Sequence, residues 1–207
     1  MNTLLAVLVR NRMPATRVLI FIIAVFILFA KPIIAEDSPI HEFMDWAGYG
    51  LIIICVLGRC FCALFIGGRK NDTLVVDGIY SVVRNPLYVF SFIGTVGIGL
   101  QTGIFTLCLA LITLFIVYYP HVVSKEENFL LARFGTPYQE YLDTVHAWVP
   151  NFSKLSYLVQ GNVSNVNLRV FLKTTFDAAL FFLAFPVLEL LEYLHVTGAI
   201  PTYFALY

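Results

Sequence analysis

Residues 87–120 read LYVFSFIGTVGIGLQTGIFTLCLALITLFIVYYP and contain no acidic or basic side chain. At about 1.5 Å per residue, one helix of this length would extend about 50 Å. A hydrocarbon core of about 30 Å needs only about 20 residues. Gln101-Thr102-Gly103 lies near the middle of the run and supplies turn residues. The sequence therefore predicts a helical hairpin that enters a membrane, turns, and returns to the same face. The second span is expected to end near Pro120, and a separate amphipathic segment is expected to begin at Glu126-Glu127.

The composition of the whole chain agrees with a membrane location. Hydrophobic residues make up 59% of the 207 residues and charged residues only 13%, against about 25% charged in a typical soluble domain. Residues 16–35, 44–66 and 171–196 form three more apolar runs, the last with a kink expected at Pro186. We therefore predict an all-α, polytopic membrane helix bundle with about five transmembrane helices and short cytoplasmic amphipathic helices.

The distribution of charge predicts the orientation. The first outer loop is acidic, with Glu36, Asp37, Glu42 and Asp45, whereas basic residues gather at the other ends of the runs. The positive-inside rule then gives a cytoplasmic N-terminus, an outer C-terminus and a cytoplasmic position for both ends of the hairpin. We expect the protein to lie in the inner membrane of a bacterium. We also expect its first apolar run, residues 16–35, to be retained and uncleaved. Because the net charge is zero, no nucleic-acid partner is expected.

Two polar clusters flank the hairpin. The first contains Gly78, Tyr80, Arg84, Asn85, Pro86 and Tyr88, and the second contains Glu126, Glu127, Tyr138 and Tyr141. If the hairpin returns to its starting face, a guanidinium, two carboxylates and several tyrosines meet beside lipid, which suggests a small-molecule site. Asn85-Pro86 is a favourable helix start, and such a start attracts anions. The alternative is a capped helix with interfacial tyrosines and with acids that complement a helix dipole.

Three further features have simpler interpretations. Gly97-Ile98-Gly99 would lie about 16 Å into the bilayer and is interpreted as a helix-packing motif. Arg59 lies inside residues 44–66, about 10 Å from the inner end of that run. It either extends toward the membrane surface or binds a lipid phosphate or carboxylate. The cysteines and histidines lack metal-ligand spacing, so no metal site is expected.

The order of residues in the two clusters resembles a known family. Gly78-x-Tyr80-x-x-x-Arg84-Asn85-Pro86-x-Tyr88, then Glu126-Glu127, Phe134-Gly135, Tyr138, Tyr141, Val145 and Pro150, resembles the pattern of isoprenylcysteine carboxyl methyltransferases and related phospholipid methyltransferases. The resemblance covers residues 74–152, so the chain reads as one domain with N-terminal spans (1–73), a methyltransferase-like core (74–152), and a connector with a last span (153–207). Asn85 stands where that family often has His, and Asn cannot titrate near neutrality.

The resemblance implies an integral membrane enzyme that transfers a methyl group from S-adenosylmethionine to a lipid or a lipidated small molecule. It implies catalytic roles for Arg84 and Glu127, and a cofactor site formed by Gly78, Tyr80, Arg84, Asn85, Pro86, Tyr88, Glu126 and Glu127. Arg59, Tyr138 and Tyr141 are candidate substrate residues. The acceptor could be an isoprenylcysteine carboxylate, a phospholipid amine or a small thiol. The alternatives are a membrane reductase of the sterol-reductase type and a non-catalytic membrane bundle.

Overall fold

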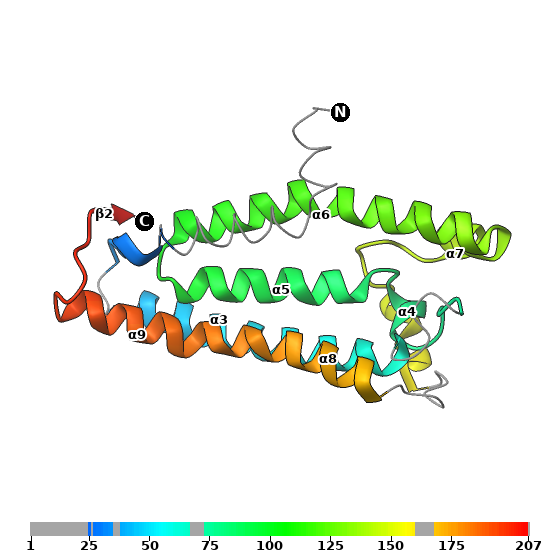
Figure 1. The fold of residues 1–207 in the computed structure, drawn as a ribbon, viewed down its shortest axis with the longest axis horizontal. Coiled ribbons are helices and arrows are strands. Elements are labelled where there is room, and N and C mark those ends of the chain that lie inside the picture. The colour runs from blue at the N-terminus through cyan, green and yellow to red at the C-terminus, as the bar shows by residue number, and fades with distance from the viewer. Residues whose placement is uncertain (1–24, 26, 35–37, 67–72, 160–167, 207) are drawn as a thin grey trace.

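The computed structural model describes residues 25, 27–34, 38–66, 73–159 and 168–206. Most of the first predicted span, residues 16–35, lies outside the described residues. The long helices are α3 (Pro39–Ile66), α5 (Pro86–Gln101), α6 (Phe105–Phe134), α8 (Leu168–Ala179) and α9 (Ala184–Val196), and they run side by side along one axis (Figure 1). The short elements α4 (Ile79–Val82), α7 (Thr136–Thr144) and η1 (Phe152–Val159) gather at one end, which we call the site end.

The predicted hairpin is present. Helix α5 ends at Gln101, the chain turns through Gly103 at φ 64°, and α6 begins at Phe105. The Thr102 hydroxyl stabilises the turn, because it donates to the carbonyl of Gly99 and accepts from the amide of Ile104. Helices α5 and α6 therefore return the chain to its starting end, as the length of the charge-free run predicts.

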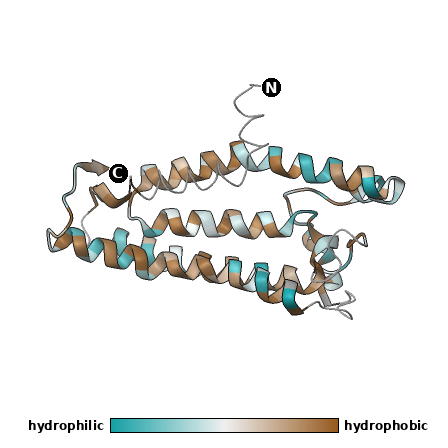
Figure 2. Ribbon diagram, in the orientation of Figure 1, coloured by the Kyte–Doolittle hydropathy of each residue, from teal (hydrophilic) through white to brown (hydrophobic). Residues whose placement is uncertain are grey.

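Helix α6 differs from the prediction at its second half. We expected the membrane span to end near Pro120 and a separate amphipathic segment to begin at Glu126-Glu127. Instead one helix of 30 residues continues through Pro120 to Phe134. Proline removes a single backbone hydrogen bond, and more than a dozen helical residues on each side preserve the helix direction. Figure 2 shows its first half mostly apolar and its second half with many hydrophilic residues toward α7. The site end of α6 is thus a rigid continuation of the span.

Glycines allow α3 and α5 to pack closely. A Cβ atom at Gly97 would lie 2.8 Å from the carbonyl oxygen of Gly48, and one at Gly48 would lie 2.7 Å from the carbonyl oxygen of Gly97. A Cβ at Gly99 would meet Cys108 on α6. The interpretation of Gly97-Ile98-Gly99 as a packing motif is therefore confirmed.

The last apolar run also forms a helical segment, with an irregularity before Pro186. The short 3₁₀ turn η2 (Leu180–Leu183) joins α8 to α9, and Pro186 leaves the Phe182 carbonyl within this turn without its usual helical donor. Helices α3, α6 and residues 171–196 are long and apolar enough to cross a membrane, and α5 is a shorter apolar helix. Four of the five predicted spans are therefore helical in the described part of the chain.

At the end opposite the site, two three-residue strands form a small parallel pair that the all-α prediction did not contain. Strand β1 (Ala30–Pro32) pairs with β2 (Phe204–Leu206), and Ala30 lies opposite Phe204. The imidazole of His195 also contacts the carbonyl of Leu28 at 2.8 Å. These contacts join segments that are far apart in the sequence, and no local pattern of residues predicts them.

Candidate functional site

The site begins with a sharp local path between α4 and α5. Gly78 adopts φ 59° immediately before α4, Val83 is extended after it, and Pro86 opens α5. Arg84 therefore lies at the centre of a three-residue bridge between the two helices, Val83 to Asn85. Its backbone amide donates to the carbonyl of His146 at 2.9 Å, so the bridge is fastened to the segment that follows α7.

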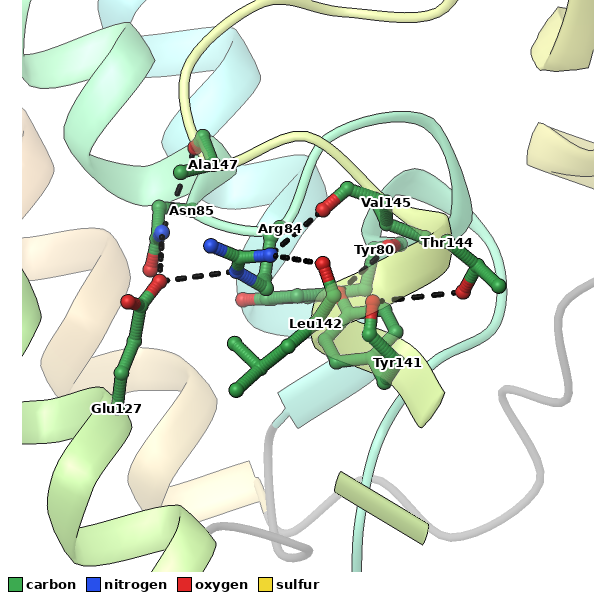
Figure 3. A network of polar contacts seen from close by, with 9 residues as sticks. All are labelled: Tyr80, Arg84, Asn85, Glu127, Tyr141, Leu142, Thr144, Val145 and Ala147. Carbon is green, nitrogen blue, oxygen red and sulfur yellow. Dashed lines mark hydrogen bonds and ion pairs between the residues drawn. The ribbon is translucent and has the colours of Figure 1, made fainter. Parts of the chain in front are cut away.

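The Arg84 guanidinium connects three separate parts of the chain. Nε donates to Oε1 of Glu127 at 2.9 Å, and Nη1 donates to the carbonyls of Leu142 and Val145 at 2.9 and 2.7 Å. Figure 3 shows the guanidinium between α6 and the end of α7. The side chain is only 11% exposed. The predicted meeting of the two polar clusters is thus present in the structure, as an ion pair that also satisfies backbone carbonyls.

Asn85 occupies the predicted helix start, but its side chain does not cap α5. The amide Nδ2 donates instead to Oε1 of Glu127 at 3.2 Å and to the carbonyl of Ala147 at 3.3 Å (Figure 3). Asn85 and Arg84 therefore share one carboxylate oxygen, and the pair holds Glu127 against the bridge. The helix start predicted at Asn85-Pro86 is therefore present, but the Asn85 side chain binds Glu127 and Ala147 and makes no capping hydrogen bond.

The two adjacent glutamates have different surroundings. Successive residues on a helix point about 100° apart, and Glu127 accordingly turns to Arg84 while Glu126 accepts a hydrogen bond of 2.7 Å from the Tyr88 hydroxyl. Glu126 lines the main cavity at the site end, and Glu127 does not. Glu126 therefore faces the cavity, whereas Glu127 is bound by Arg84 and Asn85.

The main cavity has a volume of about 770 Å³, within the range of about 300–1,000 Å³ that is usual for small-molecule sites. Its polar lining contains Arg84, Glu126 and Tyr88, and Lys125 adds an exposed cation. Apolar walls come from α5 and α6 and include Leu87, Val122, Phe129, Leu130 and Phe134. One cavity thus offers charged groups and a long apolar surface together.

Three tyrosines complete the wall. The Tyr141 hydroxyl donates to the carbonyl of Tyr80 at 2.6 Å, so it fixes α4 against α7. Burial raises the pKa of Tyr138 to about 12, and it also raises the pKa of Tyr80 and of Tyr141 above the ordinary value. The Tyr80 hydroxyl is buried and has no hydrogen-bond partner in the structure. These phenols therefore remain protonated at neutral pH, and the Tyr80 hydroxyl remains available.

Arg59 reaches the same cavity from α3. Its Nη1 donates to the hydroxyl of Ser91 on α5, and its Cζ lies 5.6 Å from the centre of the Phe181 ring. The guanidinium is therefore held between α3, α5 and η2.

Of the predicted site residues, the cavity contains Arg59, Tyr80, Arg84, Asn85, Pro86, Tyr88, Glu126, Tyr138 and Tyr141. Gly78 lies outside its lining, and a Cβ there would collide with the ring of Phe65. Lys125, Phe129 and Leu130 line the cavity but were not predicted for it. With Val122 and Glu126 they recur at the spacing of one helix face. This pattern would have predicted them as cavity residues if α6 had been expected to continue through Pro120.

Comparison with known proteins places this geometry in a family. The phospholipid methyltransferase family matches residues 51–137, which include most of the cavity lining. A nickel-cobalt-cadmium resistance protein, NccN, of Alcaligenes xylosoxydans xylosoxydans is 33% identical over 146 residues, which cover 70% of this chain and 68% of the relative. The chain belongs to the phospholipid methyltransferase family of membrane proteins.

Two other relatives extend the comparison. The cobalt-zinc-cadmium resistance protein CzcN of Cupriavidus metallidurans is 29% identical over 194 residues, which cover 93% of this chain and 87% of that protein. The protein-S-isoprenylcysteine O-methyltransferase of Schizosaccharomyces pombe is 32% identical over 94 residues, 45% of this chain and 40% of that enzyme. No solved structure matches the chain significantly. The predicted resemblance to isoprenylcysteine and phospholipid methyltransferases is confirmed.

Proposed function

We propose that this protein is a multi-pass membrane enzyme that transfers a methyl group from S-adenosylmethionine to a lipid or lipid-like acceptor. The observation that supports the proposal is the single cavity whose charged lining, with Arg84, Lys125 and Glu126, is continuous with apolar walls from α5 and α6. A charged cofactor and an apolar acceptor can occupy such a cavity together. We further propose that the site faces the cytoplasm of a bacterial cell.

The residues present suit the cofactor. A methionine moiety carries an ammonium and a carboxylate, and a ribose carries two hydroxyls. Glu126 can accept from the ammonium or the hydroxyls, because only the Tyr88 hydroxyl donates to it among the described residues. Lys125 and the Nη2 group of Arg84 can donate to the carboxylate, since the other Arg84 nitrogens already bind protein oxygens. Gly78 and Pro86 shape the bridge that holds Arg84.

When bound, S-adenosylmethionine supplies a methyl group on a sulfonium, so an acceptor lone pair forms the new bond to carbon while the electrons of the C–S bond stay on sulfur. The protein needs no nucleophile for this displacement and contributes by alignment, which can lower a barrier by about 7–11 kcal/mol in favourable cases. Glu127 holds Arg84 and Asn85 in place. The apolar walls admit the acceptor and exclude water from it.

Calorimetric titration of the purified protein in a neutral detergent tests the proposal. The wild type should bind S-adenosylmethionine and its product S-adenosylhomocysteine, and Glu126→Gln should weaken both by at least about 10-fold, since it removes a charge-assisted contact. Glu140→Gln is the matched control, because Glu140 is exposed on α7 and outside the cavity.

A wild type that binds neither compound, or Glu126→Gln with wild-type affinity, would contradict this assignment. A parallel titration with reduced nicotinamide dinucleotides tests the reductase alternative. Mass spectrometry of lipid extracts, after incubation with a labelled methyl donor, identifies the acceptor.

A further inference from the structure

The inner wall of the cavity contains a cation, Arg59, that has no carboxylate partner among the described residues. Arg59 lies seven residues before the end of α3, which is about 10 Å along the helix axis. Its Nη1 donates to Ser91, whose hydroxyl already donates to the carbonyl of Leu87. Its Nε is buried and has no hydrogen-bond partner in the part of the chain that the structure describes. Among the described residues, Arg59 forms no ion pair.

This arrangement is costly unless something else completes it. A charged side chain within a membrane span requires compensation by several kcal/mol, and a buried donor without an acceptor adds a further cost. The Ser91 hydroxyl and the face of Phe181 attract the guanidinium but carry no negative charge, so they compensate it only in part. Arg84 makes a clear contrast, because Glu127 and two carbonyls satisfy it.

A second unsatisfied donor lines the same cavity. The Tyr80 hydroxyl is buried and has no hydrogen-bond partner within the ranges that the structure describes. Burial raises the pKa of this phenol, so the hydroxyl stays protonated and can donate. Arg59 Nε and Tyr80 Oη are the buried side-chain donors of this cavity that lack an acceptor within the described residues. Two such donors, one of them charged, suit an oxygen-bearing anion.

We propose that Arg59 and Tyr80 bind a phosphate or carboxylate group of the methyl acceptor, so that the acceptor is an anionic amphiphile. This inference rests on the proposed function and names its substrate class. Ile66 and Leu87 pack against the cluster that contains Tyr80, and Val122 lines the same cavity, so these side chains provide a surface for an alkyl chain. The depth of Arg59 draws the acidic headgroup below the membrane surface, where the acceptor atom can approach the cofactor held near Glu126.

The test uses the full chain in a neutral maltoside detergent, with dodecyl phosphate and dodecanoate as anionic probes. Dodecanol controls for the alkyl chain, and inorganic phosphate controls for the anion alone. We expect the wild type to bind both anionic probes more tightly than either control. Arg59→Leu should weaken their binding by about 10- to 100-fold, and Tyr80→Phe by about 3- to 10-fold, because each removes one donor to a charged group.

Two comparisons keep the result interpretable. Arg133→Leu removes an exposed cation from α6 outside the cavity, and should leave probe binding unchanged. S-adenosylhomocysteine affinity should also stay unchanged in Arg59→Leu, and Tyr80→Phe tests the subsite if the leucine variant does not fold.

Wild-type affinity of Arg59→Leu and Tyr80→Phe for the anionic probes would overturn the proposal. So would an equal loss of S-adenosylhomocysteine binding in Arg59→Leu, because Arg59 would then belong to the cofactor. Inorganic phosphate that binds as tightly as dodecyl phosphate would overturn the assignment to an amphiphile. A wild type that binds no S-adenosyl compound refutes the proposed function instead, and Arg59-dependent probe binding remains measurable in that case.

Discussion

Three protein oxygen groups depend on one side chain at the bridge between α4 and α5. Arg84 donates to Glu127 and to the carbonyls of Leu142 and Val145. Arg84→Ala should lower the free energy of unfolding by about 2–4 kcal/mol, since Glu127 loses its ion pair and keeps only the Asn85 amide, and two carbonyls lose their donor. Arg84→Lys should lie between this variant and the wild type, because a compact ammonium cannot reproduce the guanidinium fork. Denaturant unfolding in detergent measures the effect.

The control for this measurement is Arg133→Ala. Arg133 is exposed in the last turn of α6, and an exposed substitution of this kind should change stability by less than about 0.5 kcal/mol. If Arg84→Ala unfolds at the same denaturant concentration as Arg133→Ala, the bridge does not depend on this network.

The burial of Tyr138 leads us to expect a specific pH dependence of the stability of the folded protein. Burial raises its pKa to about 12 in the folded protein, whereas an exposed tyrosine titrates near about 10. Because the folded state then keeps a proton that the unfolded state loses, this contribution is complete below about pH 10 and is lost as the pH rises to about 12. Thermal unfolding of wild type and Tyr138→Phe at pH 9 and pH 11 should show a smaller alkaline loss in the variant. An equal loss in both proteins would refute the prediction.

Residue roles were predictable only as far as the helix geometry was known. The hairpin places Arg84 near the two glutamates, and their contact follows from the sequence alone. Which glutamate faces the cavity depends on the rotation of α6, which its packing against α5 decides. Asn85 illustrates the same limit, because its capping preference is local whereas Glu127 and Ala147 reach it only in the folded chain.

At the scale of elements, local signals predicted the helix starts and turns, and competing tertiary effects decided the rest. Pro86 and Gly103 lie where the sequence placed a helix start and a turn. Pro120 was read as the end of a helix, yet α6 continues through it. A single lost hydrogen bond does not outweigh two long flanking helical segments. The β1–β2 pair was not predictable, because its two strands lie at opposite ends of the sequence.

The contact between α3 and α5 can be tested with matched glycine substitutions. A Cβ at Gly97 would lie 2.8 Å from the Gly48 carbonyl oxygen and 3.0 Å from Ile52, so Gly97→Ala must move the helices apart. Such overpacking should cost about 1–3 kcal/mol. At Gly50, also on α3, a Cβ would meet nothing within 4 Å. Gly50→Ala should therefore be neutral or slightly stabilising. Unfolding midpoints in detergent compare the two, and equal midpoints would contradict the close approach.

At the scale of the whole molecule, the bundle separates two chemically different ends. The site end holds the cavity with Arg84 and Glu126, while the opposite end holds the strand pair and the contact between His195 and Leu28. Helices α5 and α6 form a hairpin and residues 171–196 run back along it, so α7 and the end of α9 lie at opposite ends of the molecule (Figure 1). The membrane must therefore lie between these two ends.

This separation and the charge distribution together predict which positions an impermeant reagent can reach from each side of the membrane. Thr136 at the start of α7 and Thr197 after α9 are both exposed. In a variant whose four native cysteines are replaced by alanine, Thr136→Cys should react with an impermeant maleimide only in inside-out vesicles, and Thr197→Cys only in intact cells. The basic residues near the site end favour the cytoplasmic side. The reverse pattern would place the cavity outside the cell, where no S-adenosylmethionine is made, and labelling of both cysteines from one side would contradict the proposed arrangement of spans.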